Sequence, residues 1–359
     1  MKVLYKYILK NFLRYLILCL GVLVFIYIII NLFDNLGKYL AKNARLMDIF
    51  IYYLYLTPSY IVLLIPVASI MAVFFIFGIM TKNKELTALK TCGLNINKLF
   101  LLILGAGVVI SIFTFAFQET VGVWAQARLY QHKRTKIDKR PLKPHSRRRN
   151  FFYHGEDDWV YYIKRFDNKR KHLDYVILWK ITKENKIIKR IDAAAAQYDS
   201  IWTFFKVTVR DFDSLGNETV NVYPRLKMAE LKERPEDFLK RVKPVEEMNF
   251  LEIHNFVQRM SRAGQDVAEE EVELNYRFSY PLITIIILLI TLPLSVVLKK
   301  GGIAIGLGIS IIIAFVYWGA IQSCRAYGVA GLMNPMLAAW LPNLLFGAIG
   351  LLLIFRVPR

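Results

Sequence analysis

The side chains best suited to chemistry lie in one polar stretch, TKNKELTALKTCGLN, at residues 81–95 between two long apolar runs. Glu85 is its only acid and stands among lysines at positions 82, 84 and 90. A carboxylate placed against the local charge is suited to a charge-assisted hydrogen bond with a basic residue of a partner protein. The stretch therefore indicates a binding surface rather than a catalytic centre.

The other reactive residue types show no spacing that a catalytic or metal site requires. The five histidines, at positions 132, 145, 154, 172 and 254, form no H-E-x-x-H or similar ligand pattern. The sequence contains no G-x-x-x-x-G-K-[ST] loop for nucleotide phosphates, and no Ser/His/Asp order stands out. Cys19, Cys92 and Cys324 suggest no disulfide framework. We therefore expect no catalytic residue, no metal and no cofactor in this chain.

Six apolar runs dominate the chain. Of its 359 residues 55% are hydrophobic, and 24 of the 28 acids lie within residues 119–271. A bilayer core requires about 20 apolar residues of helix. Each run has close to that length or more, at roughly 15–33, 49–80, 99–118, 278–298, 303–323 and 335–355. The sequence predicts an α-helical polytopic membrane protein whose six transmembrane helices are split three and three by a large insertion.

Basic residues in the short connections predict the orientation of the spans. With the N-terminus in the cytoplasm, the cytoplasmic segments hold twelve Lys and Arg residues, whereas the short outer loops hold four. Lys and Arg are enriched in cytoplasmic loops. We therefore expect both termini in the cytoplasm and the large insertion on the outer side.

The insertion changes from helical to strand periodicity. It opens with a polar helical stretch, and the segments DDWVYYIKRF, LDYVILWKI, NKIIKRI and IWTFFKVTVRDF then combine β-branched and aromatic residues with partial alternation. AAAAQYDS lies between strands, which favours a strand there too. We expect an all-β sandwich or jelly roll at about 150–240, and helix again after Pro244. The expected division is 1–120 for the first three spans, 121–270 for the insertion and 271–359 for the last three spans.

The polar stretch that holds Glu85 is expected to form a short amphipathic helix parallel to the membrane. Asn83 can cap it with Glu85 in second position, where the helix dipole favours an acid, and Gly93 can end it. Leu86 and Leu89 lie along one face. A helix that buries nothing in its own chain suits a groove on a partner. From physics alone, an ordinary interfacial loop helix is an equal alternative.

NKELTALKTCGLN resembles the coupling-helix motif of the lipopolysaccharide-transport permeases, the LptF/LptG (YjgP/YjgQ) family. The resemblance extends over nearly the whole chain. It includes the opening YKYILKNFLRYLILCL, FDNLGKYL after the first span, and RAGQDVAEEEVELNYRFSYPL at the entry to the fourth. FDNL and the segments WVYYIKRF and LDYVILWKI are closer to the LptG branch.

The resemblance implies a permease subunit of an ABC transporter, not an enzyme. Such a subunit extracts lipopolysaccharide from the bacterial inner membrane and passes it to periplasmic jelly-roll carriers for delivery to the outer membrane. The implied partners are a second LptF/LptG-type permease, LptC-like and LptA-like carriers, and an LptB-type ATPase dimer that binds ATP and Mg. No nucleic acid is implied. The chain would be a multi-pass inner-membrane protein with a periplasmic β domain.

The resemblance also implies two sets of site residues. Coupling to the ATPase would use Glu85, Leu86, Leu89, Lys90 and Gly93, with Glu85 meeting a basic residue of the ATPase. Lipopolysaccharide carries lipid chains and anionic phosphates, so basic residues at the outer span ends are its expected contacts: Lys38, Lys42, Arg45, Lys133 and Arg134. Lys38 matches a lysine that relatives use near the charged head of the lipid, whereas Asn31 stands where they carry a lysine.

Other classes of protein make different demands on the sequence. A membrane-bound lipid hydrolase or transferase needs convergent polar side chains at one membrane depth, and the spans contain almost none. A secondary transporter for a lipid or another amphiphile usually has ionisable residues near the midplane, whereas Arg277 and Arg325 lie near span ends. An ABC-type permease that signals, or that carries another amphiphile, remains an alternative, and the partner proteins would distinguish these classes.

Overall fold

The computed structural model describes residues 2–92, 96–139, 147–155, 159–168, 170–182, 186–213, 217–239, 243–262, 266–297 and 302–356. The chain divides into two compact units. The membrane unit comprises Met1–Pro141, Val245–Ile253 and Ala268–Arg359. The β unit comprises Leu142–Pro244 and His254–Val267.

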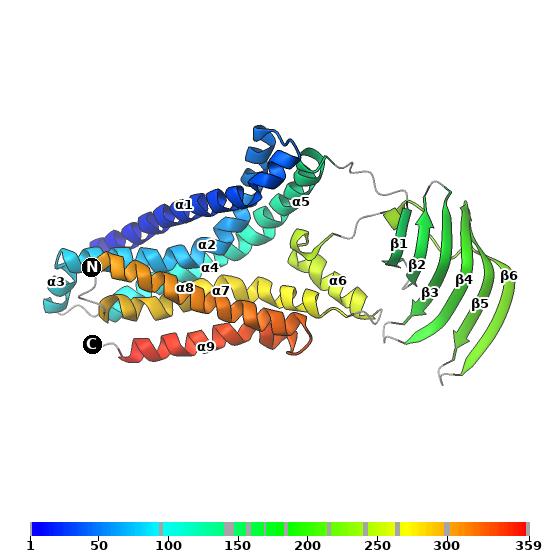
Figure 1. The fold of residues 1–359 in the computed structure, drawn as a ribbon. Helices are drawn as coiled ribbons and strands as arrows, with labels where there is room; N and C mark the ends of the chain where they lie inside the picture. Colours follow the sequence, from blue (N-terminus) through cyan, green and yellow to red (C-terminus); the bar gives the residue numbers. More distant parts are fainter. Residues whose placement is uncertain are drawn as a thin grey trace. The chain divides into compact units, whose positions relative to one another are not determined.

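Six helices of the membrane unit are long and apolar enough to cross a bilayer. They are α1 (Lys2–Ala41), α2 (Leu46–Lys82), α4 (Ile96–Phe117), α7 (Ala268–Val297), α8 (Gly302–Val329) and α9 (Pro335–Arg356). Three precede the β unit in the chain and three follow it (Figure 1). The six apolar runs predicted from the sequence are confirmed as helices.

The third of these helices continues well beyond its apolar run. After α4 come a π-helical turn, η1 (Gln118–Gly122), then α5 (Val123–His132), and a second π-helical turn, η2 (Lys133–Ile137). α5 packs against α2. The polar start of the insertion is thus helical, as expected, and it belongs to the membrane unit rather than to the β unit.

The core of the membrane unit lies among α1, α2, α4 and α7. Phe12, Phe77, Phe100 and Leu288 meet there, all nearly free of solvent contact. In their most apolar stretches α2 and α7 are 67% and 72% buried, whereas α1 and α8 are only 17% and 22% buried. The outward faces of α1 and α8 are therefore available to lipid or to another protein.

One glycine shows how closely two of these helices pack. A Cβ atom on Gly306 of α8 would lie 2.8 Å from Cδ1 of Phe74 on α2. Small residues let membrane helices approach each other. The absence of a side chain at Gly306 therefore allows α8 to pack closely against α2.

The β unit contains a six-stranded antiparallel sheet whose strands pair in sequence order (Figure 1). The strands are β1 (Arg147–His154), β2 (Trp159–Asp167), β3 (His172–Ile181), β4 (Ile187–Asp199), β5 (Ile201–Phe212) and β6 (Glu218–Met228). The inserted all-β domain is confirmed, and AAAAQYDS falls in β4 and the residue after it, as the strand interpretation predicts. Among the described strands, β1 and β6 are the sheet edges.

One face of the sheet is covered by aromatic side chains. Phe238 of the short helix η3 (Asp237–Leu239) is fully buried and packs edge-on against Tyr161 and Phe166, and near Trp202. Tyr161 donates a hydrogen bond to the Glu233 carboxylate at 2.6 Å, and burial raises the pKa of the Tyr161 hydroxyl. This layer holds the sheet together without a disulfide among the described residues.

α6 (Phe250–Arg262) begins in the membrane unit and continues in the β unit from His254. Asn249 caps it reciprocally with Glu252: Asn249 Oδ1 accepts from the Glu252 amide at 2.8 Å, and Glu252 Oε2 accepts from the Asn249 amide at 3.1 Å. This capping box explains why the helix starts where it does.

Candidate functional site

The basic residues expected at the lipid site lie on neighbouring elements of the membrane unit. Lys38 lies in the last turn of α1, Lys42 directly follows that helix, Arg45 precedes α2, and Lys133 and Arg134 lie in η2. Tyr39 and Tyr52 pack against Leu129 and Ile137 in one buried cluster, which joins these elements. The structure therefore brings residues from three separate segments to one end of the bundle.

These basic residues differ in how far their charge is already matched. Lys42 forms an ion pair with Asp138 across 96 positions of sequence. Arg134 donates to the Tyr130 hydroxyl at 3.2 Å, and Lys133 lies 5.9 Å from the centre of the Tyr52 ring. Within the described parts of the chain, no ion pair involves Lys38, Arg45 or Lys133. These three exposed charges are the ones best able to meet an anionic ligand.

Lys38 ends a chain of polar contacts along α1. Its Nζ donates to Asn35 Oδ1 at 2.9 Å, and Asn35 Nδ2 donates to Asn31 Oδ1 at 3.3 Å. Asn31 Oδ1 also accepts from the Tyr53 hydroxyl at 3.1 Å, and the Tyr39 and Tyr53 hydroxyls are 3.3 Å apart. Asn31 thus adds no charge of its own, but it helps to order the side chains that reach Lys38.

The candidate coupling helix is α3 (Glu85–Thr91), at the same end of the bundle as the first turns of α1 and the last turns of α9 (Figure 1). Glu85 is its first residue, not its second, and Lys84 precedes it with a φ of 61°. Asn83 does not cap α3 with its side-chain oxygen. Instead its backbone amide caps the end of α2, and its side-chain amide donates to Glu85 Oε1 at 3.2 Å.

The expectation that α3 buries nothing in its own chain is wrong. Leu86 is 3% exposed and belongs to the membrane-unit core, and Leu89 packs partly buried against that core. The two leucines anchor α3, so its open surface lies elsewhere and includes Thr87, Ala88 and Thr91. Lys90 lies within α3, although the structure does not describe its side chain, and Gly93 lies outside the described residues.

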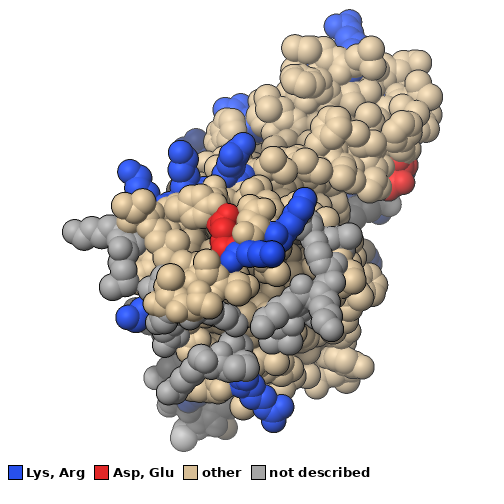
Figure 2. All heavy atoms as spheres, turned by 90° about the vertical axis from the view of Figure 1, so that its left-hand side faces the viewer, with Lys and Arg blue, Asp and Glu red and all other residues tan. Residues whose placement is uncertain are grey.

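Glu85 is half-buried, and among the described residues its carboxylate contacts Asn83 and Tyr7. Asn83 reaches one oxygen, and the Tyr7 hydroxyl of α1 lies 3.4 Å from the other. Lys and Arg outnumber acids on this face of the molecule (Figure 2). The exposed basic residues at these helix ends include Lys6, Lys10, Lys82, Lys84, Lys98 and Arg356. Glu85 is therefore an acid within a basic surface, as its sequence context indicates.

A buried charge network lies at the opposite ends of α4 and α7, and sequence reasoning missed it. Arg277 is 3% exposed and donates from Nη1 to Glu119 Oε1 at 2.9 Å. Glu273 Oε1 lies 3.9 Å from Arg277 Nε, and Glu273 Oε2 pairs with Arg325 of α8 at 2.6 Å. The four-residue spacing of Glu273 and Arg277 on one helix was the available signal. Their partners on other helices gave no local signal.

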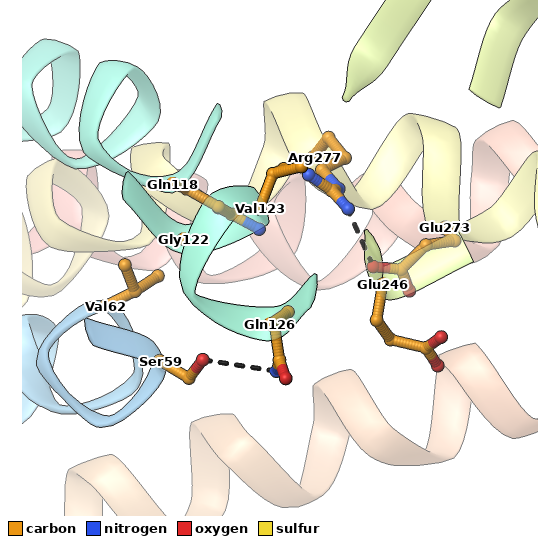
Figure 3. Close-up of a pocket in the computed structure, with 9 residues that line it drawn as sticks. All are labelled: Ser59, Val62, Gln118, Gly122, Val123, Gln126, Glu246, Glu273 and Arg277. Atoms are coloured by element: carbon orange, nitrogen blue, oxygen red, sulfur yellow. Dashed lines mark hydrogen bonds and ion pairs between the residues drawn. The ribbon is translucent and has the colours of Figure 1, made fainter. Parts of the chain in front are cut away.

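A polar pocket of about 170 Å³ adjoins this network (Figure 3). Its lining residues are Ser59, Val62, Gln118, Gly122, Val123, Gln126, Glu246, Glu273 and Arg277. Gln126 Nε2 donates to Ser59 Oγ at 3.2 Å, whereas Gln118 Oε1 and Arg277 Nε are buried and have no hydrogen-bond partner within the described part of the chain. Since a water occupies about 30 Å³ of liquid, the pocket has room for a few waters but not for a lipid with several acyl chains. The pocket is therefore too small to enclose such a lipid.

The described residues define the class of protein. Among them, no three His, Cys, Asp or Glu side chains gather as a metal site would require. Six apolar helices, split three and three around an inserted antiparallel sheet, define a multi-pass membrane protein. Residues 6–356 match the family described as "Lipopolysaccharide export system permease LptF/LptG", and the chain belongs to this family of inner-membrane transport permeases. A search of curated protein sequences gave no match.

Proposed function

We propose that this chain is a permease subunit of an ABC transporter that extracts lipopolysaccharide from the inner membrane. The observation that carries the proposal is the family match over residues 6–356, essentially the whole chain. A separate ATPase dimer of the LptB type binds ATP and Mg and drives the movement. A second LptF/LptG-type permease completes the membrane part, and FDNL at 33–36 favours the LptG branch for this chain.

In this proposal the α3 end of the bundle faces the cytoplasm. The exposed lysines near the start of α1, the end of α2 and the start of α4 support this orientation, because basic residues are retained on the cytoplasmic side. Both termini are then cytoplasmic. The β unit, inserted after the third span, is periplasmic.

α3 docks on the ATPase in the proposed complex. Its buried leucines support this role in an unexpected way, because they tie α3 to the core formed by α1, α2 and α4. A push on a helix that is anchored in this manner is transmitted to the spans as rigid-body motion. The open side of α3, with Thr87, Ala88 and Thr91, meets the groove, and Glu85 meets a basic residue of the ATPase.

At the other end of the bundle, the proposed lipid site uses the exposed charges of Lys38, Arg45 and Lys133 for the phosphates. The weakly buried face of α1 supplies apolar surface for the acyl chains. The edge strands of the described sheet, β1 and β6, are suited to the next step, since a strand edge can accept a strand of another protein. β6 exposes Val220, Val222 and Tyr223. LptC-like and LptA-like jelly-roll carriers are the proposed partners there.

The second candidate function is transport driven by an ion gradient. The buried charges around Arg277 are the observation that could favour it. Arg277 lies 20 residues from Val297 at the far end of α7, which corresponds to about 30 Å of helix. That length matches the full hydrocarbon thickness, so the charges lie at a boundary of the bilayer rather than at its midplane. This position disfavours a midplane ion relay.

Purification of the full chain from its host membrane in mild detergent tests the proposal. The expected result is co-elution of an ATPase subunit and a second permease, with bound lipopolysaccharide identified by mass spectrometry. The Glu85→Lys chain, purified in parallel, should retain the permease partner and lose ATPase. A homogeneous chain with no ATPase partner, transporting an amphiphile along an ion gradient, would contradict the proposal.

A further inference from the structure

The buried charge network also holds the segment that returns from the β unit to the membrane unit. Glu119 Oε1 accepts a hydrogen bond from Arg277, and Glu119 Oε2 accepts one from the Phe250 backbone amide at 2.7 Å. Arg277 Nη2 donates to the Val245 carbonyl oxygen at 3.1 Å. Two side chains, 158 positions apart, thus hold the returning segment on both sides of Met248.

Phe250 is the first residue of α6, and its amide is one of the groups that a helix leaves without an internal partner. The capping box of Asn249 and Glu252 serves other groups of the first turn. Glu119 supplies a further acceptor, and its negative charge lies at the positive end of the helix dipole. The membrane unit therefore contributes a cap to a helix whose later residues belong to the β unit.

Glu119 is the main charge partner of Arg277, and the other nearby acid, Glu273, cannot replace it. A guanidinium remains charged in proteins, and a buried charge without a partner is costly. Glu273 is 3.9 Å from Arg277 and is engaged by Arg325 at 2.6 Å. Glu119, at 2.9 Å, is the closer partner of Arg277.

We propose that Arg277 and Glu119 are positioning residues that fix the start of α6 on the membrane bundle. Arg277 orients the Glu119 carboxylate, and Glu119 holds the first turn of α6. A shift of α4 or α7 then moves the start of the helix that leads into the β unit. For transport, this positioning means that movements of the spans reach the β unit through α6. This consequence rests on the proposed function.

Hydrogen exchange of the full chain in its complex tests the positioning role. Glu119→Gln retains a neutral acceptor for the Phe250 amide and removes the ion pair. The double variant Glu119→Arg with Arg277→Glu restores an ion pair of reversed polarity, but leaves that amide without its acceptor. We expect exchange in the first turn of α6 to rise about tenfold in the double variant, and less in Glu119→Gln.

Arg165→Gln is the control, because it breaks an exposed ion pair with Asp174 inside the β unit and should leave α6 exchange unchanged. A variant is taken as folded when hydrogen exchange in α4 and α7 matches that of the wild type. If the double variant does not fold, the result for Glu119→Gln alone tests the positioning role. Wild-type exchange of α6 in the folded variants would overturn the positioning role.

The transport consequence is measured as lipid released per ATP hydrolysed in proteoliposomes. In Glu119→Gln this ratio should fall, and Glu119→Asp, which retains the carboxylate, should restore part of it. A general loss of folded complex would lower both activities together and leave the ratio unchanged, which would overturn the consequence for transport. If the wild-type complex releases no lipid, the proposed function is wrong, whereas the exchange experiment still decides the positioning role.

Discussion

Lys38 and Lys42 are only one helical turn apart, but their surroundings give them different roles. Lys42 pairs with Asp138, whereas Lys38 is exposed and contacts only the amide of Asn35 among the described residues. Lys38→Glu should reduce crosslinking of lipopolysaccharide to a photoreactive residue at Leu36 by about fivefold or more, since a lysine contributes about 1 kcal/mol to anion binding at a membrane surface. Lys42→Gln is the matched comparison.

Crosslinking in the Lys42→Gln chain should be closer to the wild-type level than in Lys38→Glu, because the charge that is lost is already offset by Asp138. Assembly of the complex should be unchanged in both variants. Equal crosslinking in Lys38→Glu and in the wild type would show that Lys38 is ordinary surface.

Glu85 is the residue at which an ATPase contact is most sensitive to charge. Reversal in Glu85→Lys should weaken ATPase association by about 30-fold or more, because loss of one partner in a desolvated charge pair costs about 2–5 kcal/mol. The measurement is ATPase co-elution with the full chain, together with lipid release. Tyr7→Phe removes the intrachain contact to the same carboxylate, 3.4 Å away, and should have little effect. Wild-type co-elution and release in Glu85→Lys would contradict the role.

Tyr161 predicts an alkaline limit to the stability of the β unit. Burial raises the pKa of Tyr161 above its ordinary value of 10.0, and the neighbouring Glu233 carboxylate adds to the shift. The neutral hydroxyl is therefore favoured in the folded state, and its contribution to the free energy of unfolding is complete below about pH 10 and is lost as the pH rises further. Tyr161→Phe should remove part of this loss.

The measurement is hydrogen exchange of the β4 and β5 segments of the full chain at several pH values, corrected for the intrinsic rate. At neutral pH the Tyr161→Phe chain should be less protected, because the 2.6 Å hydrogen bond to Glu233 is absent. If the Tyr161→Phe chain lost as much protection at alkaline pH as the wild type, groups other than Tyr161 would be responsible for the pH dependence.

At the scale of elements, α9 approaches α7 closely at Gly350. A Cβ atom on Gly350 would lie 2.8 Å from the Leu289 Cβ and 3.3 Å from the Ile290 backbone nitrogen, so α7 itself would have to shift. Gly350→Ala should destabilise the bundle by about 1–3 kcal/mol, as overpacking of a close contact does. The check is the midpoint of thermal unfolding in detergent.

Gly347 supplies the control on the same helix, three residues earlier. No described atom lies within 4 Å of the Cβ position there, so Gly347→Ala should leave the midpoint nearly unchanged. Similar losses in the two variants would mean that helix flexibility, rather than the α7 contact, is responsible.

For the whole molecule, the orientation in the membrane can be tested with a native cysteine. Cys92 is exposed beside α3, so a membrane-impermeant maleimide should label it in inside-out vesicles and not in right-side-out vesicles. In a Cys92→Ser chain, Val222→Cys on β6, at a position 73% exposed, should show the reverse. Labelling of both positions from one side would contradict the proposed topology.

Features set by local periodicity could be predicted from the sequence. The length of each apolar run determined the six spans, because a bilayer has a fixed thickness. Alternating aromatic and β-branched residues determined most of the strands. AAAAQYDS, whose alanines alone would favour a helix, was predicted as a strand from its position between strands. The isolated acid Glu85 and the basic residues near the outer span ends were visible in the same way, because residue type and neighbours are enough to find them.

Only the tertiary structure decided which of these residues are free and which are engaged. The sequence assigned Leu86 to a partner, but the fold buries it in the core of its own chain. Lys42 finds Asp138 across 96 positions, and Arg277 finds Glu119 across 158. Local patterns hold no information about such distant pairs, because the partner of a charge depends on how separate helices come together. The start of α6 on the membrane bundle is therefore a property of the folded chain alone.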